Sequence, residues 1–174
     1  MNSLSRVGIA LGSNVGDRLQ NLRGAVLELR KFHVASEHFI LSRIYQSDPV
    51  DCPEGSEWFA NAVIEMTVDS NPLALLKQLH ALEAAAGRPP IHEKNAPRPL
   101  DLDILYWDDQ TIDLPELQIP HPQITSRSFV LAPLSDVCPL RVLPGQTQSI
   151  ASLAAALPPD AGCVVTNDRL VSFC

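Results

Sequence analysis

The alternation of hydrophobic and polar positions along the chain predicts strands near the N-terminus and in the middle of the sequence. Close to the N-terminus, VGIALGS places apolar residues at every second position, the period of a strand. The same period runs through FANAVIEMTV at residues 59–68. Because successive side chains of a strand point to opposite faces, we expect Phe59 and Asn61 to share one face, with the apolar set beginning at Ala60 on the other.

Apolar residues also recur at helical spacing in two stretches. The first follows the turn GSNVGD, and the second begins where Ser70 or Asn71 can act as the N-cap, with Pro72 in the first turn. Gly87 ends the second helix. The expected inward positions are Leu19, Leu22, Val26 and Leu29 in the first helix and Leu75, Leu76, Leu79, Leu82 and Ala86 in the second.

The remaining patterned segments complete a fold prediction. FILSRIY and LDLDILYW have the composition of strands, and SFVLAPLSDV that of a helix. The order strand, helix, strand, strand, helix, strand predicts a ferredoxin-like α+β sandwich, βαββαβ, with an antiparallel sheet. We expect one domain over residues 1–174, with a core at about 6–140 and a C-terminal helical extension at about 145–174, in which we find no chemistry.

Composition and charge narrow the class of partner. The chain has 174 residues, of which 45% are hydrophobic, and its 13 basic and 20 acidic residues give a formal charge of −7. This sign disfavours a nucleic-acid partner and favours a small molecule. The four cysteines are far apart and are expected to be reduced thiols. No membrane span or secretory signal is apparent, so we expect a cytoplasmic protein.

Two aspartates in the segment LDLDI form a candidate metal site. Asp101 and Asp103 fall on one face of the strand, roughly 6.6 Å apart at about 3.3 Å per residue, while Leu100, Leu102 and Ile104 face the core. Like charges on one strand face repel, so a cation is expected to bind between them. Carboxylates without Cys or His suit magnesium, which takes further ligands from substrate phosphates. The alternative is an edge strand with a solvated acidic face.

Basic residues flank this pair. Arg88, Lys94 and Arg98 precede it, and His121 and Arg127 follow. Such a cluster suits a polyphosphate, whose transfer depends on positioning and charge neutralisation, although a solvated basic loop is the alternative for any one residue. Glu83 falls on the inward stripe of its helix and is predicted either to pair with Arg88 or Arg98 or to contact a ligand. GSNVGD lacks the Lys-Ser/Thr of a phosphate loop and is interpreted as a turn between strand and helix.

Several motifs in order across residues 12–134 together resemble one enzyme family. These are GSN, FxNAV, ExxxGR, APRPLDLDIL and PHPxxxxRxFVLxPL. The combination resembles 6-hydroxymethyl-7,8-dihydropterin pyrophosphokinase of folate biosynthesis. The resemblance implies the ferredoxin-like fold and transfer of the pyrophosphoryl group of ATP to the hydroxymethyl oxygen of the pterin, with release of AMP and use of two Mg²⁺ ions. It implies ATP and a reduced pterin as partners; a monomer is expected, with a dimer left open.

The resemblance also implies roles for individual residues. Asp101 and Asp103 match the magnesium-binding pair, and Arg88 and Arg98 match catalytic arginines that engage the triphosphate. Further ATP contacts are implied for Glu83, Ile104, His121 and Arg127, and pterin contacts for Ser47, Asp48, Val50, Phe59, Asn61 and Phe129. In that assignment Phe59 and Phe129 sandwich the pterin ring, Asn61 binds its edge, and residues 47, 48 and 50 offer backbone groups. The loops at 46–58 and 88–98 are expected to close over the substrates.

The sequence departs from the family pattern at five positions, and two other functions remain possible interpretations. Pro90, Lys94, Asn95, Glu116 and Pro122 replace residues typical of the family, and they bear on loop closure and ATP affinity rather than on the core chemistry. One alternative is an RNA-binding module with the same order of elements, although its expected basic, aromatic-rich strand is missing. The other is a two-metal phosphohydrolase built on the two aspartates, which would leave the paired phenylalanines without a role.

Overall fold

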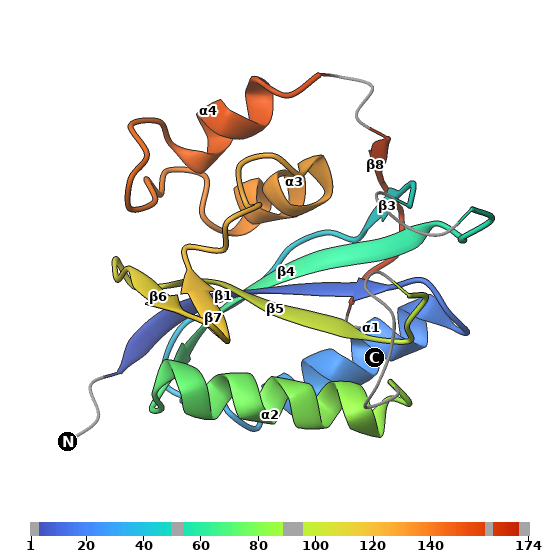
Figure 1. The fold of residues 1–174 in the computed structure, drawn as a ribbon, viewed down its shortest axis with the longest axis horizontal. Helices are drawn as coiled ribbons and strands as arrows, with labels where there is room; N and C mark the ends of the chain where they lie inside the picture. Colours follow the sequence, from blue (N-terminus) through green and yellow to red (C-terminus); the bar gives the residue numbers. More distant parts are fainter. Residues whose placement is uncertain (1–3, 50–53, 89–95, 159–161, 171–174) are drawn as a thin grey trace.

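The computed structural model describes residues 4–49, 54–88, 96–158 and 162–170, which form a twisted antiparallel sheet with helices on both faces (Figure 1). The elements run in chain order as β1 Ser5–Ser13, α1 Arg18–Leu29, β2 Phe39–Leu41, β3 Tyr45–Ser47, β4 Phe59–Val68, α2 Pro72–Ala85, β5 Asp101–Trp107, β6 Ile112–Leu114, β7 Leu117–Ile119, α3 Ser128–Val137, α4 Ile150–Ala155 and β8 Cys163–Val165. The predicted α+β class with an antiparallel sheet is confirmed.

The main sheet has the strand order β5-β1-β4-β3-β8, and β2 also pairs with β4. The long strands β1 and β4 lie side by side over their whole length, from Ser5 opposite Val68 to Ser13 opposite Ala60. β6 and β7 form a separate hairpin. This arrangement places β5 and β4 on either side of β1, so side chains from both can meet across one strand.

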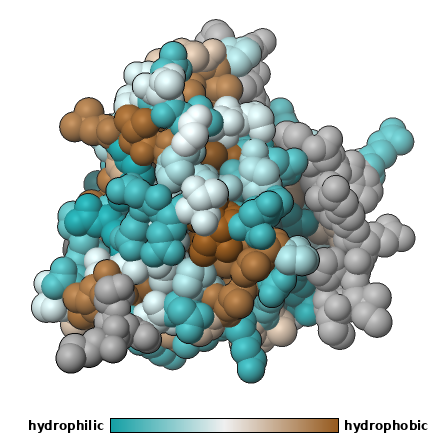
Figure 2. All heavy atoms as spheres, turned by 60° about the vertical axis from the view of Figure 1, so that its left-hand side comes forward, coloured by the Kyte–Doolittle hydropathy of each residue, from teal (hydrophilic) through white to brown (hydrophobic). Residues whose placement is uncertain are grey.

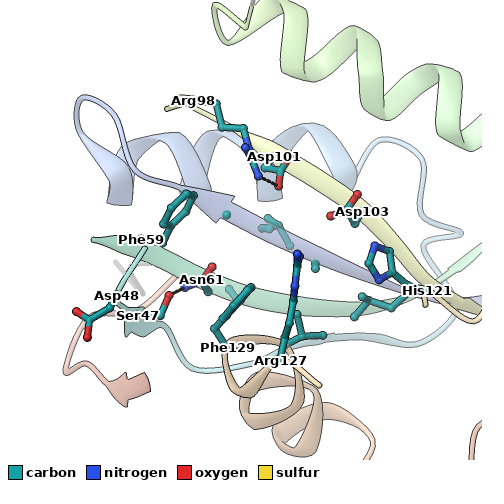
Figure 3. Close-up of a pocket in the computed structure, with 16 residues that line it drawn as sticks. Ser47, Asp48, Phe59, Asn61, Arg98, Asp101, Asp103, His121, Arg127 and Phe129 are labelled. Atoms are coloured by element: carbon teal, nitrogen blue, oxygen red, sulfur yellow. Dashed lines mark hydrogen bonds and ion pairs between the residues drawn. The ribbon is translucent and has the colours of Figure 1, made fainter. Parts of the chain in front are cut away.

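Two apolar layers cover the two faces of the sheet. Helices α1 and α2 lie on one face, and α3 and α4 lie on the other (Figure 1). Alternation decides which layer a strand residue enters. Ile64 of β4 and Leu102 of β5 join the α1 and α2 layer, whereas Val63 and Leu105 join the α3 and α4 layer. Asp101, Asp103, Phe59 and Asn61 therefore project toward α3 (Figure 3).

The ends of the helices follow the predicted capping chemistry. Asn71 is the N-cap of α2, and its Oδ1 accepts a hydrogen bond from the Ala74 N–H at 2.9 Å. In α2 the predicted stripe is buried at Leu75 and Leu79 and partly buried at Leu76 and Leu82, but Ala86 is exposed, because the helix ends at Ala85.

The predicted strand at FILSRIY is divided in the structure. β2 ends at Leu41 and β3 begins at Tyr45. Between them the Ser42 N–H still donates to the Val63 carbonyl at 2.9 Å, but the Val63 N–H donates to the Ser42 hydroxyl, also at 2.9 Å, instead of to a backbone carbonyl. The division leaves β3 as a short strand that carries Ser47 at its end.

The C-terminal extension contains a strand of the main sheet in addition to the predicted helix. Helix α4 is shorter than the alanine-rich stretch and is capped by Ser149. The chain then returns to the sheet as β8, which pairs with β3 from Tyr45 opposite Val165 to Ser47 opposite Cys163. Leu170 is buried in the α1 and α2 layer. The extension thus contributes an edge strand and a core residue.

The surface mixes polar and apolar side chains. On the face shown in Figure 2, hydrophobic patches are interrupted by hydrophilic ones. Large exposed apolar residues include Leu140 and Val164. Among the helices of the described residues, none is long and apolar enough to cross a membrane.

Candidate active site

A pocket opens on the α3 face of the sheet and gathers residues from distant parts of the chain (Figure 3). β5 supplies Asp101 and Asp103 from one side, and β4 supplies Phe59 and Asn61 from the other. The pocket is lined by Ala10, Leu11, Gly12, Ser47, Asp48, Phe59, Asn61, Ala62, Arg98, Asp101, Asp103, Leu105, His121, Arg127, Phe129 and Val130. Residues predicted for the ATP side and for the pterin side thus line one cavity.

Gly12 of β1 forms the floor between the two sides. It pairs with Asp101 in one direction and with Asn61 in the other. A Cβ at this position would lie 3.5 Å from Asn61 Oδ1 and 3.8 Å from both the Asp101 Cβ and a Phe59 ring carbon. Glycine therefore keeps open the space between the carboxylates and the aromatic ring. From the sequence, Gly12 was expected only to belong to the turn between strand and helix.

The Asp101 carboxylate holds two arginines. Arg98 Nη2 donates to Oδ2 at 2.7 Å, and Arg88 Nη1 donates to Oδ1 at 3.0 Å. The Arg98 guanidinium also lies over the Phe59 ring, 5.8 Å from its centroid. The two predicted loop arginines are thus brought to the first aspartate, and Arg98 spans the gap between the acidic and aromatic sides.

Glu83 holds Arg88 in place beside Asp101. It is 5% exposed, as its place on the inward stripe predicts. Its Oε1 accepts from Arg88 Nη1 at 2.5 Å and from the Leu102 N–H at 2.8 Å. Burial raises the pKa of Glu83 to about 7, although the Leu102 N–H and the Arg88 charge act to lower it. Of the two interpretations left open by the sequence, the structure shows the pairing with Arg88, and an ATP contact stays a prediction.

Asp103 has a different environment from Asp101. Burial raises its pKa, and the Asp101 charge raises it further, while His121, Arg98 and Arg127 act in the opposite direction. Burial lowers the pKa of His121, and Asp103 opposes this effect. The His121 Nδ1 accepts from the Gln123 N–H at 3.2 Å, which orients the ring. Asp103 is therefore a half-buried carboxyl group whose charged form is disfavoured by desolvation and would be stabilised by a further cation.

The other half of the pocket combines two phenylalanines with hydrogen-bonding groups. Asn61 Nδ2 donates to Ser47 Oγ at 2.8 Å, so each fixes the other's orientation. Phe129 projects into the pocket from α3, and the Arg127 guanidinium lies 5.4 Å from its ring centroid. Rings from two different elements with an amide between them can hold a flat, polar-edged ligand.

Some predicted residues are not in this pocket, or have a backbone group that is already bound. The Ile104 side chain packs in the α1 and α2 layer, so its backbone alone could contact ATP. The Asp48 N–H already donates to the Gly162 carbonyl at 3.1 Å, so its carbonyl is the backbone group left for a ligand. Val50 and the departures at residues 90, 94 and 95 lie outside the described residues, and the departures Glu116 and Pro122 are exposed and do not line the pocket.

Comparison with known proteins decides the family. The sequence model of the 7,8-dihydro-6-hydroxymethylpterin-pyrophosphokinase family matches residues 8–139. The chain belongs to this family. It is therefore an enzyme, a pyrophosphokinase, and the predicted family is confirmed. The interpretations as an RNA-binding module or a phosphohydrolase are set aside.

Individual relatives in the pyrophosphokinase family are similar over most of their length. The 2-amino-4-hydroxy-6-hydroxymethyldihydropteridine pyrophosphokinase of Bacillus subtilis is 40% identical over 130 residues, which are 75% of this chain and 76% of that protein. The enzyme of the same name from Pseudomonas aeruginosa is 35% identical over 156 residues, 89% of this chain and 93% of its own.

Solved structures are similar in fold. The HPPK-DHPS protein of Plasmodium falciparum, in its A437G/K540E form with pterin and p-hydroxybenzoate, superimposes with a TM-score of 0.71 at 16% identity. The superposition covers 89% of this chain and 44% of that one. This chain thus spans less than half the length of that protein, and the likeness concerns the fold alone.

Proposed function

We propose that this pocket carries out the reaction of its family, the transfer of the pyrophosphoryl group of ATP to the hydroxymethyl oxygen of 6-hydroxymethyl-7,8-dihydropterin, with release of AMP, in folate biosynthesis. One observation carries the assignment to this site. A pair of carboxylates with arginines faces two phenylalanines and an amide across Gly12 in a single cavity. The acidic and basic side would bind the triphosphate, and the aromatic side would bind the pterin.

Asp101 and Asp103 would hold Mg²⁺ together with the triphosphate. The donor set fits this ion, because both groups offer carboxylate oxygens and the burial of Asp103 leaves its charge in need of a cation. In the described part of the chain, no group of three or more His, Cys, Asp or Glu could hold a metal by itself, so phosphate oxygens and water would complete the coordination. Bound here, two ions would neutralise charge on the attacking and leaving oxygens.

Arg98 and Arg88 would bind and orient the phosphates. Arg98 uses Nη2 for Asp101, and its Nε is buried without a hydrogen-bond partner among the described residues. A planar guanidinium that is already fixed by one carboxylate can offer its other donors to phosphate oxygens at little entropic cost. His121 and Arg127 line the same side and would contact ATP from the region before α3.

The pterin would bind between Phe59 and Phe129. Stacking on two rings fixes the plane of the heterocycle, and Asn61, oriented by Ser47, can read its polar edge. Because β4 and β5 flank β1, this position brings the hydroxymethyl oxygen toward the carboxylates. The predicted closure of the loops at 46–58 and 88–98 belongs to the same proposal, although residues 50–53 and 89–95 of these loops lie outside the described residues.

Four further features of the molecule belong to the same proposal. The arrangement of the α+β elements is ferredoxin-like. In support of this, the elements follow in the order expected for βαββαβ: β1, α1, the divided strand β2 and β3, then β4, α2 and β5. A single catalytic domain contains both half-sites, and the enzyme acts as a monomer. The free thiols Cys138 and Cys163 agree with a cytoplasmic location.

The nucleotide product tests the proposal. The protein is incubated with ATP, Mg²⁺ and 6-hydroxymethyl-7,8-dihydropterin, and the nucleotides are separated by chromatography. We expect AMP to form only when the pterin is present. Formation of ADP would indicate transfer of a single phosphoryl group, and free phosphate without the pterin would indicate a phosphohydrolase; either result would overturn the proposal.

A further inference from the structure

The turn that follows β1 meets the segment that precedes β5 through a pair of reciprocal hydrogen bonds. Asn14 Oδ1 accepts the Arg98 N–H at 2.8 Å, and the Asn14 N–H donates to the Arg98 carbonyl at 3.2 Å. Both polar groups of the Arg98 backbone are therefore bound by one residue that is 84 positions away in the sequence. Asn14 is the last residue of the GSN motif; Gly12 of that motif forms the floor of the pocket, but the catalytic proposal gives Asn14 no role.

The Asn14 side chain serves this contact alone among the described residues. It is 2% exposed, and its Nδ2 is buried with no hydrogen-bond partner. The turn itself is held by another residue, since Asn21 Nδ2 donates to Ser13 Oγ at 3.1 Å and to the Val15 carbonyl at 2.9 Å. A buried amide with an unpaired donor is costly, and the turn does not need it. The hydrogen bond to the Arg98 backbone is therefore the contact that accounts for an asparagine at position 14.

The backbone of Arg98 determines where its guanidinium can reach. From that backbone the side chain meets Asp101 Oδ2 at 2.7 Å and lies over the Phe59 ring. Both contacts are inside the pocket, between the acidic and the aromatic side. A long flexible side chain keeps such a position only if its starting point is fixed, and errors of about 1 Å in an active site can cost about a hundredfold in rate.

We propose that Asn14 is a positioning residue for ATP, acting by holding the Arg98 backbone so that its guanidinium meets the triphosphate beside Asp101. The inference rests on the proposed function. It assigns to Asn14 the task of fixing the Arg98 backbone from the turn directly after β1, without contact between Asn14 and substrate. Asn14 is not among the residues that line the pocket.

A double-mutant cycle tests the proposal, with equilibrium ATP affinity and single-turnover rate measured for each variant. We expect Asn14→Ala and Arg98→Ala each to lower ATP affinity by about tenfold or more, because the first displaces the Arg98 guanidinium and the second removes it. In the double variant, Asn14→Ala should add less than about twofold to the effect of Arg98→Ala, since residues that act through one another are not additive. Pterin affinity should stay close to that of the wild type.

Asn71→Ala is the matched control, because Asn71 Oδ1 also accepts a backbone N–H, at 2.9 Å, but at the N-terminus of α2. It should lose thermal stability and keep its ATP affinity. If Asn14→Ala does not fold, Asn14→Ser takes its place, because its hydroxyl keeps a polar group in the turn but is too short to reach Arg98. Additive losses in the cycle, or an Asn14 variant that behaves like Asn71→Ala, would overturn the inference. A wild-type protein that makes no AMP would instead overturn the proposed function.

Discussion

The two aspartates of β5 show how residues with the same sequence pattern acquire different properties. Both are half-buried, but Asp101 is bound by two arginines, whereas desolvation raises the pKa of Asp103 and the charges of His121 and Arg127 act to lower it. Alternation predicted that they share a face, but not this difference. The arginines come from the segment before β5 and from the end of α2, so the distinction depends on tertiary contacts.

Replacing each aspartate by asparagine should separate the two environments. Asp101→Asn should lower the free energy of unfolding by about 1–3 kcal/mol without ATP and Mg²⁺, because Arg88 and Arg98 lose a charged acceptor. Asp103→Asn should leave the free energy of unfolding unchanged or raise it, because the variant removes a carboxylate whose charge is disfavoured by desolvation. Urea unfolding measures both values. An equal loss of unfolding free energy in the two variants would contradict this distinction. Turnover should fall at least about a hundredfold in each variant.

Arg98→Lys should impair the reaction although it keeps the charge. Lysine cannot hold Asp101 and present a planar fork to phosphate at the same time, so we expect the single-turnover rate to fall by about tenfold or more. Arg23→Lys is a control outside the pocket, where the arginine Nε donates to the Arg169 carbonyl. Equal rates in Arg98→Lys and the wild type would show that charge alone is sufficient.

Sequence reasoning located most of the pocket at the residue scale because strand and helix periods fix directions. Phe59 and Asn61 share a face, and Glu83 is inward, as the periods predict. The bond between Asn14 and Arg98 and the place of Gly12 in the floor could not be predicted. Each depends on the register of β1 with its neighbours, which no local pattern contains.

At the scale of elements, α3 is tied to the strand edge by a polar cluster. Asp136 of α3 accepts from the Arg43 guanidinium at 2.6 and 3.1 Å and from the Tyr45 hydroxyl at 3.0 Å. Burial acts to raise the pKa of Asp136, but the bonds from Arg43 and Tyr45 outweigh it and hold that pKa below its usual range. Because α3 also carries Phe129, this cluster helps to set the width of the aromatic side.

Asp136→Asn should destabilise the protein in a pH-dependent way. A carboxyl whose folded pKa is lowered stabilises the fold above its unfolded pKa of about 3.9 and loses this contribution as pH falls through the folded value. We therefore expect a deficit of about 1–3 kcal/mol at pH 7 that shrinks below about pH 4. Urea unfolding across this range measures it. Asp113→Asn, at an exposed hairpin contact, should show no deficit, and a deficit in Asp136→Asn that persists unchanged in acid would refute the assignment.

Strand β8 connects the C-terminal extension to the pterin side of the pocket. Gly162, with φ of +63°, precedes β8, and a Cβ there would lie 3.0 Å from Asp48 Oδ2. This role could not be predicted from the sequence, because a short apolar segment after a glycine does not specify which strand it pairs with. The extension in which we expected no chemistry therefore supports a residue that lines the pocket.

Gly162→Ala should weaken pterin binding and leave ATP binding unchanged. The new methyl group would crowd Asp48 and add backbone strain of about 1–2 kcal/mol at a positive φ. Gly145→Ala is the matched control, since its φ is +77° and a Cβ there meets nothing within 4 Å. Calorimetry of pterin binding should separate the two variants. If both bind the pterin equally well, β8 does not set the position of Asp48 in the pocket.

At the scale of the whole molecule, the main apolar core lies on one face of the sheet and the pocket lies on the other. The α1 and α2 layer takes the apolar residues of β1, β4 and β5, and the opposite face leaves room beside α3 for the carboxylates, the arginines and the aromatic rings. The protein has a formal net charge of −7, but Arg98 and Arg127 place positive charge in the pocket. An anionic substrate can therefore bind there although the protein as a whole is acidic. The order of elements predicted an α+β fold with an antiparallel sheet; the second helical layer, the division of FILSRIY and the return of β8 depended on contacts between distant segments.

The phosphorus content of the pterin product tests the central claim most directly. The wild-type protein is incubated with ATP, Mg²⁺ and 6-hydroxymethyl-7,8-dihydropterin, and the pterin product is analysed by mass spectrometry while AMP is quantified in the same sample. The account predicts a pterin diphosphate formed in equal amount to AMP, because both phosphoryl groups move together from a triphosphate held at Asp101 and Asp103. A pterin monophosphate, or AMP formed without a matching amount of pterin diphosphate, would contradict it.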